Sequence, residues 1–194
     1  MAESGKLIAL EAIDDVAVGR LAEELCRWIR ERGMAVEHTR EPTYGPAGIL
    51  LLLARQGRLT FDATSLALLY LADRLDHAQR VGGIGTWQAA GRHVICTHYR
   101  LAAEARLCGQ VEWDWLHRID SLSCTPDLTL YVDFPAQETR QDSLRAGYYA
   151  AIQRLRNEGQ EIYVIDGATA LEHLHLACKK HLACLLGLEL SGPQ

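Results

Sequence analysis

The stretch that decides the fold is LIALEAIDDVAVGRLAEELCRWIRERG, residues 7–33. Residues 6–11 contain the continuous apolar run LIAL at residues 7–10, which favours a strand buried on both of its faces. In residues 18–32 the apolar side chains recur at helical spacing, which predicts an amphipathic helix, and Gly33 ends it. A buried strand that leads through a short loop into a helix is the repeating unit of a parallel sheet.

The same alternation continues along the chain. Further strands are predicted at residues 34–39, 93–99, 126–135 and 161–166, and further helices at residues 64–80, 112–122, 137–157 and 169–188. This order predicts an α/β fold in three layers, with a parallel five-stranded sheet and helices on both faces. No repeat or low-complexity linker interrupts the pattern, so we expect a single domain over residues 1–194.

The composition excludes several kinds of partner. The chain has 194 residues, 48% of them hydrophobic, which is enough for the core of one domain. Its formal net charge of −5 gives no indication of binding to nucleic acid or to an anionic membrane.

Because no apolar run could span a bilayer and no secretory signal is recognisable, we expect a cytoplasmic protein. Its six cysteines are then expected to be buried thiols.

Several short motifs occur in an order that resembles one enzyme family. They are TREP (residues 39–42), ARQGRL (54–59), LLYLADRLDH (68–77), GRHVICTHY (91–99) and PDLTLYVDFP (126–135). Together they resemble the thymidylate kinases, enzymes of the P-loop NTPase fold that transfer a phosphoryl group from ATP to dTMP. The resemblance covers roughly residues 7–166. It implies ATP and Mg²⁺ as cofactors and a nucleoside monophosphate as partner.

The loop after the first strand departs from the pattern of this family. The family reads Glu-Gly-x-Asp-Gly-x-Gly-Lys-Ser-Thr, whereas this chain reads EAIDDVAVGR at residues 11–20, so that only Glu11 and Asp14 match. The positions of the glycines, the lysine and the two hydroxyl residues hold Ala12, Asp15, Ala17, Val18, Gly19 and Arg20. Glycines let backbone N–H groups face the phosphate oxygens, and the lysine neutralises them. We therefore expect a degenerate Walker A loop, in which Asp14 keeps the family's catalytic position but does not function alone.

The positions that contact dTMP in the family are better preserved. By resemblance, Arg40 would contact the phosphate, Tyr70 would stack on the base, and Arg74 would bond the edge of the base. Tyr99 matches the tyrosine of the family's Asp-Arg-Tyr motif, and His98 replaces its arginine; a protonated His98 would strengthen binding as the pH falls toward 6. Without the resemblance, we would interpret Tyr70 as a core residue and Asp73-Arg74 as an ordinary surface pair.

Other segments carry weaker expectations. The lid region, about residues 136–160, is expected as one plain helix, and GGIGTW (82–87) as a connection. The closing helix contains His173, His175, Cys178, His181 and Cys184. This spacing fits no standard zinc pattern, so we expect no metal site there, with the cysteines pointing inward. By resemblance, the apolar helix around residues 66–75 makes a homodimer plausible.

Two hypotheses about function follow. The first is a thymidylate-kinase-like pseudoenzyme whose phosphorylation of dTMP is lost or strongly impaired, leaving a nucleotide-binding, regulatory or structural role. The alternative is a working dTMP kinase with an atypical donor loop.

Overall fold

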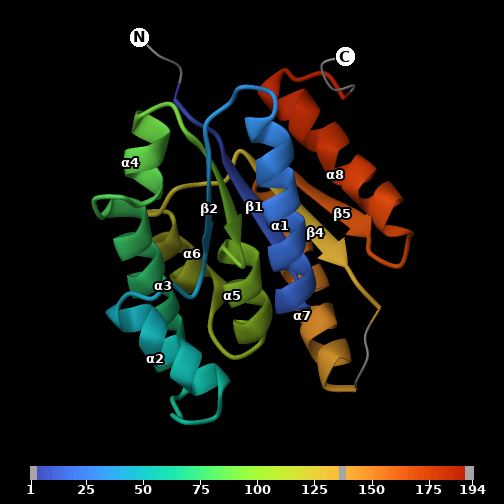
Figure 1. Ribbon diagram of the computed structural model, residues 1–194. Coiled ribbons are helices and arrows are strands. Elements are labelled where there is room, and N and C mark those ends of the chain that lie inside the picture. The colour runs from blue at the N-terminus through green and yellow to red at the C-terminus, as the bar shows by residue number, and fades with distance from the viewer. Residues whose placement is uncertain (1–3, 136–138, 191–194) are drawn as a thin grey trace.

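A sheet of parallel strands, in the order β2-β3-β1-β4-β5, forms the centre of the molecule (Figure 1). The structure is a computed structural model that describes residues 4–135 and 139–190. The strands are β1 (Leu7–Ala12), β2 (Val36–Arg40), β3 (His93–Thr97), β4 (Leu128–Asp133) and β5 (Ile162–Asp166). Every pairing between neighbours is parallel. The five-stranded parallel sheet predicted from the sequence is confirmed.

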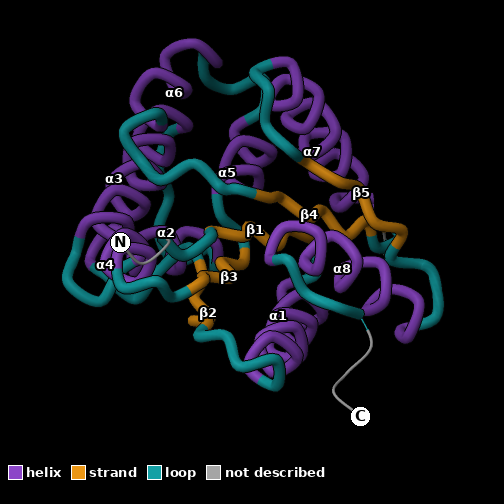
Figure 2. Tube along the Cα trace, turned by 90° about the horizontal axis from the view of Figure 1, so that it is seen from above, coloured by secondary structure: helices purple, strands orange, loops and turns teal. Residues whose placement is uncertain are grey.

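Helices cover both faces of this sheet (Figure 2). They are α1 (Asp15–Arg30), α2 (Pro46–Arg55), α3 (Ala63–Gln79), α4 (Ile84–Ala89), α5 (Arg100–Leu107), α6 (Trp113–Asp120), α7 (Thr139–Asn157) and α8 (Leu171–Leu186). α1 and α8 pack on one face, whereas α5 and α7 pack on the other (Figure 2). The predicted three-layer arrangement is therefore confirmed.

The central strand explains why the opening stretch of the sequence shows no alternation. All six residues of β1 are buried, because β1 lies between β3 and β4 and both of its faces are covered. On one face, Leu21, Leu25 and Ile29 of α1 join the core cluster that contains Leu10 of β1. The helical spacing of these apolar residues is what attaches α1 to the sheet.

Several local expectations were wrong. α2, α4 and α5 were not predicted, and residues 82–87 do not form a simple connection, because Gly83 precedes the first turn of α4. α4 has only six residues, too few for a helical period to stand out. All six cysteines are free thiols, but Cys108 and Cys184 are exposed. The expectation that Cys184 points inward is therefore wrong.

α7 occupies residues 139–157 of the expected lid, while residues 136–138 lie outside the described part of the chain. Within the described residues, no helix has the length and apolar character needed to cross a membrane.

Candidate functional site: a pocket beside the end of β1

A pocket of about 920 Å³ opens beside the residues that follow β1. In parallel α/β sheets, ligands bind at the carboxyl ends of the strands, and β1 ends here. The wall is formed by Ile13 and Asp15 after β1, by Arg55 of α2, by Tyr70 of α3 and by Arg106 of α5, with further residues of α7. Among the site residues predicted from the sequence, Asp15 and Tyr70 line this pocket.

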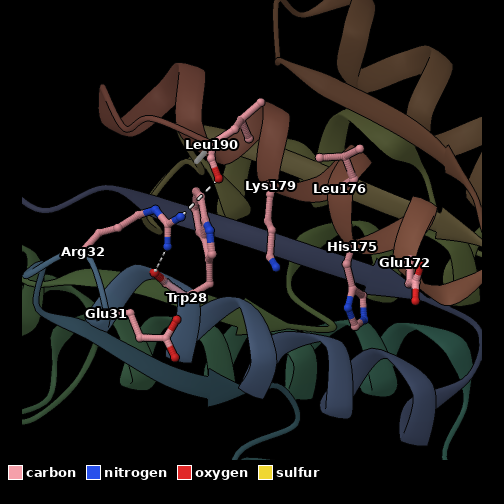
Figure 3. Close-up of a pocket in the computed structure, with 8 residues that line it drawn as sticks. All are labelled: Trp28, Glu31, Arg32, Glu172, His175, Leu176, Lys179 and Leu190. Atoms are coloured by element: carbon pink, nitrogen blue, oxygen red, sulfur yellow. Dashed lines mark hydrogen bonds between the residues drawn. The ribbon is translucent and has the colours of Figure 1, made fainter. Parts of the chain in front are cut away.

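A second pocket lies apart from the predicted site residues (Figure 3). It has a volume of about 750 Å³ and lies between α1 and α8. Arg32 stacks over the Trp28 ring at 4.2 Å, and Lys179 lies 6.0 Å from the same ring. Because the two cations already cover the aromatic surface and Arg32 bonds backbone carbonyls, this pocket is the weaker candidate for a ligand.

The residues that the resemblance aligns with the family's phosphate loop include the first turn of a helix. α1 begins at Asp15, and Asp14 is its N-cap. The Asp14 carboxylate accepts hydrogen bonds from the backbone N–H groups of Val16 and Ala17, each at 2.9 Å. A phosphate would need such N–H groups to be free, but here the protein's own carboxylate uses them. The buried Ala12 ends the strand that leads into this turn.

Val18, which the resemblance aligns with the family's lysine, faces the core. Val18 has no exposed surface and belongs to the apolar cluster between α1, α8 and the sheet. Gly19 is half-buried and Arg20 is exposed. Val18 and Gly19 carry neither the charge nor the hydroxyl that a bound ATP and Mg²⁺ require, and Arg20, although cationic, has no hydroxyl for the metal. The residues present therefore do not fit these cofactors.

Asp15 instead forms an ion pair with Arg55 at the wall of the pocket and contacts the ring of His98. Its Oδ2 and Oδ1 atoms lie 2.7 and 3.0 Å from Nη2 of Arg55, which joins α1 to α2. Its Oδ1 also lies 3.2 Å from Nε2 of His98. Burial by itself raises the pKa of the Asp15 carboxyl, but the positive charges around it outweigh this effect and lower the pKa. Asp15 is therefore a stable negative charge at the wall of the pocket.

His98 is buried behind Asp15. It is 4% exposed, its backbone has a φ of 57°, and neither ring nitrogen makes a hydrogen bond. Burial lowers its pKa to about 4; the Asp15 charge opposes this shift, and the charges of Arg55, Arg106 and Arg40 add to it. His98 is thus neutral at pH 6 in the protein without ligand, which disfavours the predicted gain in binding at that pH.

Arg74 belongs to a buried network rather than to the pocket wall. Its Nε donates to Glu41 Oε2 at 3.0 Å, and its Nη1 donates to Asp120 Oδ1 at 2.6 Å. Its Nη2 donates to the backbone oxygen of Tyr99 at 3.1 Å. Since the Arg74 side chain is only 2% exposed, it does not form an ordinary surface pair. Each of its three guanidinium nitrogens has a partner within the protein.

The remaining predicted residues have mixed surroundings. Tyr99 is fully buried, donates its hydroxyl to the Cys124 carbonyl at 2.8 Å, and lies under the Arg74 guanidinium. Arg40, at the end of β2, is half-buried, and its Nε is buried without a hydrogen-bond partner. Tyr70 is 9% exposed, so it packs in the core and also borders the pocket. The structure thus brings Asp15 and His98 together beside the pocket that Tyr70 lines, and places Arg74 and Tyr99 in a separate buried network.

Four charged residues of these two regions were missed by the sequence reasoning. Arg55 and Arg106 face the pocket, while Glu41 and Asp120 hold Arg74. Arg55 lies in the ARQGRL motif and Glu41 in TREP, so their segments, though not their roles, were identifiable. Arg106 could not be found in this way, because α5 itself was not predicted.

Two further groups of polar residues are buried near the site. Glu11 accepts from the backbone N–H of Leu101 at 3.1 Å, and burial raises its pKa to about 8 in spite of the Arg74 charge. Glu41, His77 and Cys96 lie close enough to one another to hold a metal ion. However, the ring nitrogens of His77 lie 3.0 Å from Glu41 and 2.8 Å from Thr39, so both are already engaged. This group stabilises the network around Arg74.

The histidines and cysteines of α8 do not converge. Cys178 is buried whereas Cys184 is exposed, and His181 lies against the Tyr163 ring.

Comparison with known proteins gives a consistent result. The family model described as "Thymidylate kinase" matches residues 20–145. A protein of Pyrococcus horikoshii named "Probable thymidylate kinase" is 29% identical over 95% of this chain and 99% of its own length. A thymidylate kinase of Rhizorhabdus wittichii is 32% identical over 74% of this chain and 71% of its own.

The fold agrees with these sequence matches. The crystal structure of a thymidylate kinase from Ehrlichia chaffeensis superposes with a TM-score of 0.73, at 19% identity, and covers 92% of this chain and 98% of its own. The family resemblance inferred from the motifs is confirmed. The chain belongs to the thymidylate kinase family.

Proposed function

We propose that this member of the family does not phosphorylate dTMP efficiently with ATP, and that it acts as a nucleotide-binding pseudoenzyme with a regulatory or structural role. The observation that carries the proposal is the start of α1 at Asp15. The residues that would wrap the ATP phosphates in a family kinase are here the first turn of a helix.

The missing charge has a large expected effect on the reaction. A lysine about 4 Å from a phosphate oxygen contributes about 4 kcal/mol at an effective dielectric constant near 20. Losing that amount from the transition state lowers the rate on the order of a thousandfold. Here Val18 is buried at the lysine position, and Asp15 adds a negative charge nearby. Both changes disfavour the binding of the triphosphate group of ATP.

The pocket beside Tyr70 supports retained binding of a nucleoside monophosphate. Its volume of about 920 Å³ lies within the range of small-molecule sites. Tyr70 can offer a ring to a base, and Arg55 and Arg106 are cations at the same wall. The donor side has lost its binding groups, whereas the acceptor side has kept a pocket with aromatic and cationic walls.

Calorimetric titration with ATP–Mg²⁺ and with dTMP, each alone, tests this proposal together with a coupled kinase assay. We expect no heat with ATP–Mg²⁺, measurable binding of dTMP, and no turnover. Turnover at the rates of ordinary kinases, about 1–100 s⁻¹, would instead establish a working dTMP kinase with an atypical donor loop. If neither ligand binds, the remaining role is a structural one.

The oligomeric state and the location remain predictions. A homodimer through α3 is expected to appear in sedimentation experiments; Leu68 on this helix is 49% exposed. The cytoplasmic location can be checked by fractionation of the native host.

A further inference from the structure

Resting on the proposed function, we propose that the Asp15 carboxylate is an internal anion of this pocket. It occupies, within a cluster of arginines, the place that the phosphate group of a ligand would take. Asp15 thereby competes with phosphate monoesters and acts as an autoinhibitory contact of the site.

The cluster contains more positive than negative charge. Arg55 and Arg106 line the pocket with Asp15, and the charge of Arg40 acts on the adjoining His98. Arg55 is paired with Asp15, whereas the side chain of Arg106 has no hydrogen bond or ion pair to a described residue. With two guanidinium groups and one carboxylate in its wall, the pocket favours a further anion, or a stronger one in place of Asp15.

His98 supplies a second, independent indication of a missing ligand. Its ring is buried, and although Nε2 lies 3.2 Å from Oδ1 of Asp15, neither ring nitrogen makes a hydrogen bond. Buried polar groups are almost always bonded, and an exception in a native structure requires an explanation, such as a catalytic role or a bound ion. The positive φ of this residue is likewise uncommon outside glycine and costs free energy. A phosphate oxygen in this position could accept the proton of the neutral ring.

Asp15 can leave the cluster without undoing its helix. α1 is capped by Asp14, not by Asp15. The side chain of Asp15 is 39% exposed, so it has solvent on one side into which it can rotate. Because Asp15 does not cap α1, replacing it by asparagine is a mild change that removes only the charge at the pocket.

Titration with inorganic phosphate tests the competition directly. Affinity is measured calorimetrically, and the shift in Tm with phosphate concentration serves as a second readout. Asp15→Asn is expected to bind phosphate at least tenfold more tightly than the unchanged protein. Asp114→Asn is the matched control, since Asp114 is also an exposed acid in the first turn of a helix and carries the same charge change. It should leave the affinity unchanged.

A double variant locates the bound phosphate. Adding Arg106→Gln to Asp15→Asn should remove the gain, whereas adding Arg118→Gln, an exposed arginine on α6, should not. The proposal is overturned if Asp15→Asn binds phosphate no better than the Asp114→Asn control. It is equally overturned if the gain survives the loss of Arg106.

This test is separate from that of the proposed function. Phosphate binding is measured without ATP or nucleotide. Kinase activity would therefore contradict the proposed function, but it would not change what the phosphate titration says about Asp15. An inactive kinase in which Asp15→Asn gains no affinity would contradict only the role of Asp15. The Tm without phosphate confirms that each variant is folded.

Discussion

The guanidinium of Arg74 lies 2.6 Å from the carboxylate of Asp120, and the two side chains are 2% and 1% exposed. This pair joins α3 to the end of α6, and Glu41, after β2, holds the same guanidinium from another side. The resemblance predicts that Arg74 bonds the base of dTMP, whereas its surroundings in this chain are those of a structural ion network. A buried network of this kind is sensitive to the loss of one partner.

Replacing Arg74 by alanine should therefore destabilise the fold. Glu41 and Asp120 would remain buried without their common cation, which costs about 3–5 kcal/mol in the free energy of unfolding. Urea denaturation measures this difference. Arg58→Ala is the control; Arg58 is exposed, so its loss should change the free energy by no more than about 0.5 kcal/mol. If Arg74→Ala costs no more than Arg58→Ala, the network does not hold these elements together.

Restoring the family's lysine at residue 18 should fail in this chain. Val18 is fully buried, so Val18→Lys would place an ammonium group in an apolar core, and it should cost more than about 3 kcal/mol of stability. Val16→Lys is a matched control, because Val16 is 63% exposed on the same first turn. Its effect should stay near 0.5 kcal/mol. Equal stability of the two variants would show that residue 18 can turn toward solvent.

The sheet could be predicted because its strands are short apolar runs separated by long amphipathic helices. α5 was missed for a physical reason: Arg100 and Glu104 are charged but buried, and they satisfy each other at 2.6 Å. In a sequence pattern based on the helical spacing of apolar residues, such charged residues are expected to face solvent. The cluster at the pocket was missed because it joins Asp15 to Arg55, which is 40 residues away. The loop after β1 marked the departure from the family, but only the fold shows what the new carboxylate contacts.

The ring of Tyr70 is expected to carry much of the binding of dTMP. Stacking of a base on an aromatic side chain is worth about 1–3 kcal/mol. Tyr70→Ala should therefore weaken dTMP binding roughly ten- to a hundredfold in calorimetry, while Tyr70→Phe should retain it. Tyr44→Ala serves as the control, because Tyr44 is 77% exposed and lies outside the pocket wall. Unchanged affinity in Tyr70→Ala, at a temperature where the variant is folded, would show that Tyr70 is a core residue only.

The stability of the protein should depend on pH through Glu11. Its pKa is about 8 in the folded state against an ordinary value of 4.5, because burial disfavours the charged form. Between these two values the folded protein retains a proton that the unfolded chain releases, so the free energy of unfolding falls as the pH rises from about 5 to 8. Glu11→Gln keeps an oxygen that accepts from the Leu101 N–H, and it stays neutral at every pH. It should match the unchanged protein at pH 5 and exceed its stability at pH 8 by at least about 1.4 kcal/mol, the equivalent of one pKa unit.

Denaturation with urea at a series of pH values measures this difference. Glu112→Gln is the control, since Glu112 is exposed and its side chain makes no capping bond. Its stability should follow that of the unchanged protein at each pH. A slope with pH remains in Glu11→Gln, because burial also raises the pKa of Glu104, to about 7, and this acts in the same direction. If the free energies of unfolding of Glu11→Gln and of the unchanged protein change in parallel from pH 5 to 8, Glu11 is ionised in the folded state. The buried carboxyl beneath α5 would then be held as an anion by Arg74.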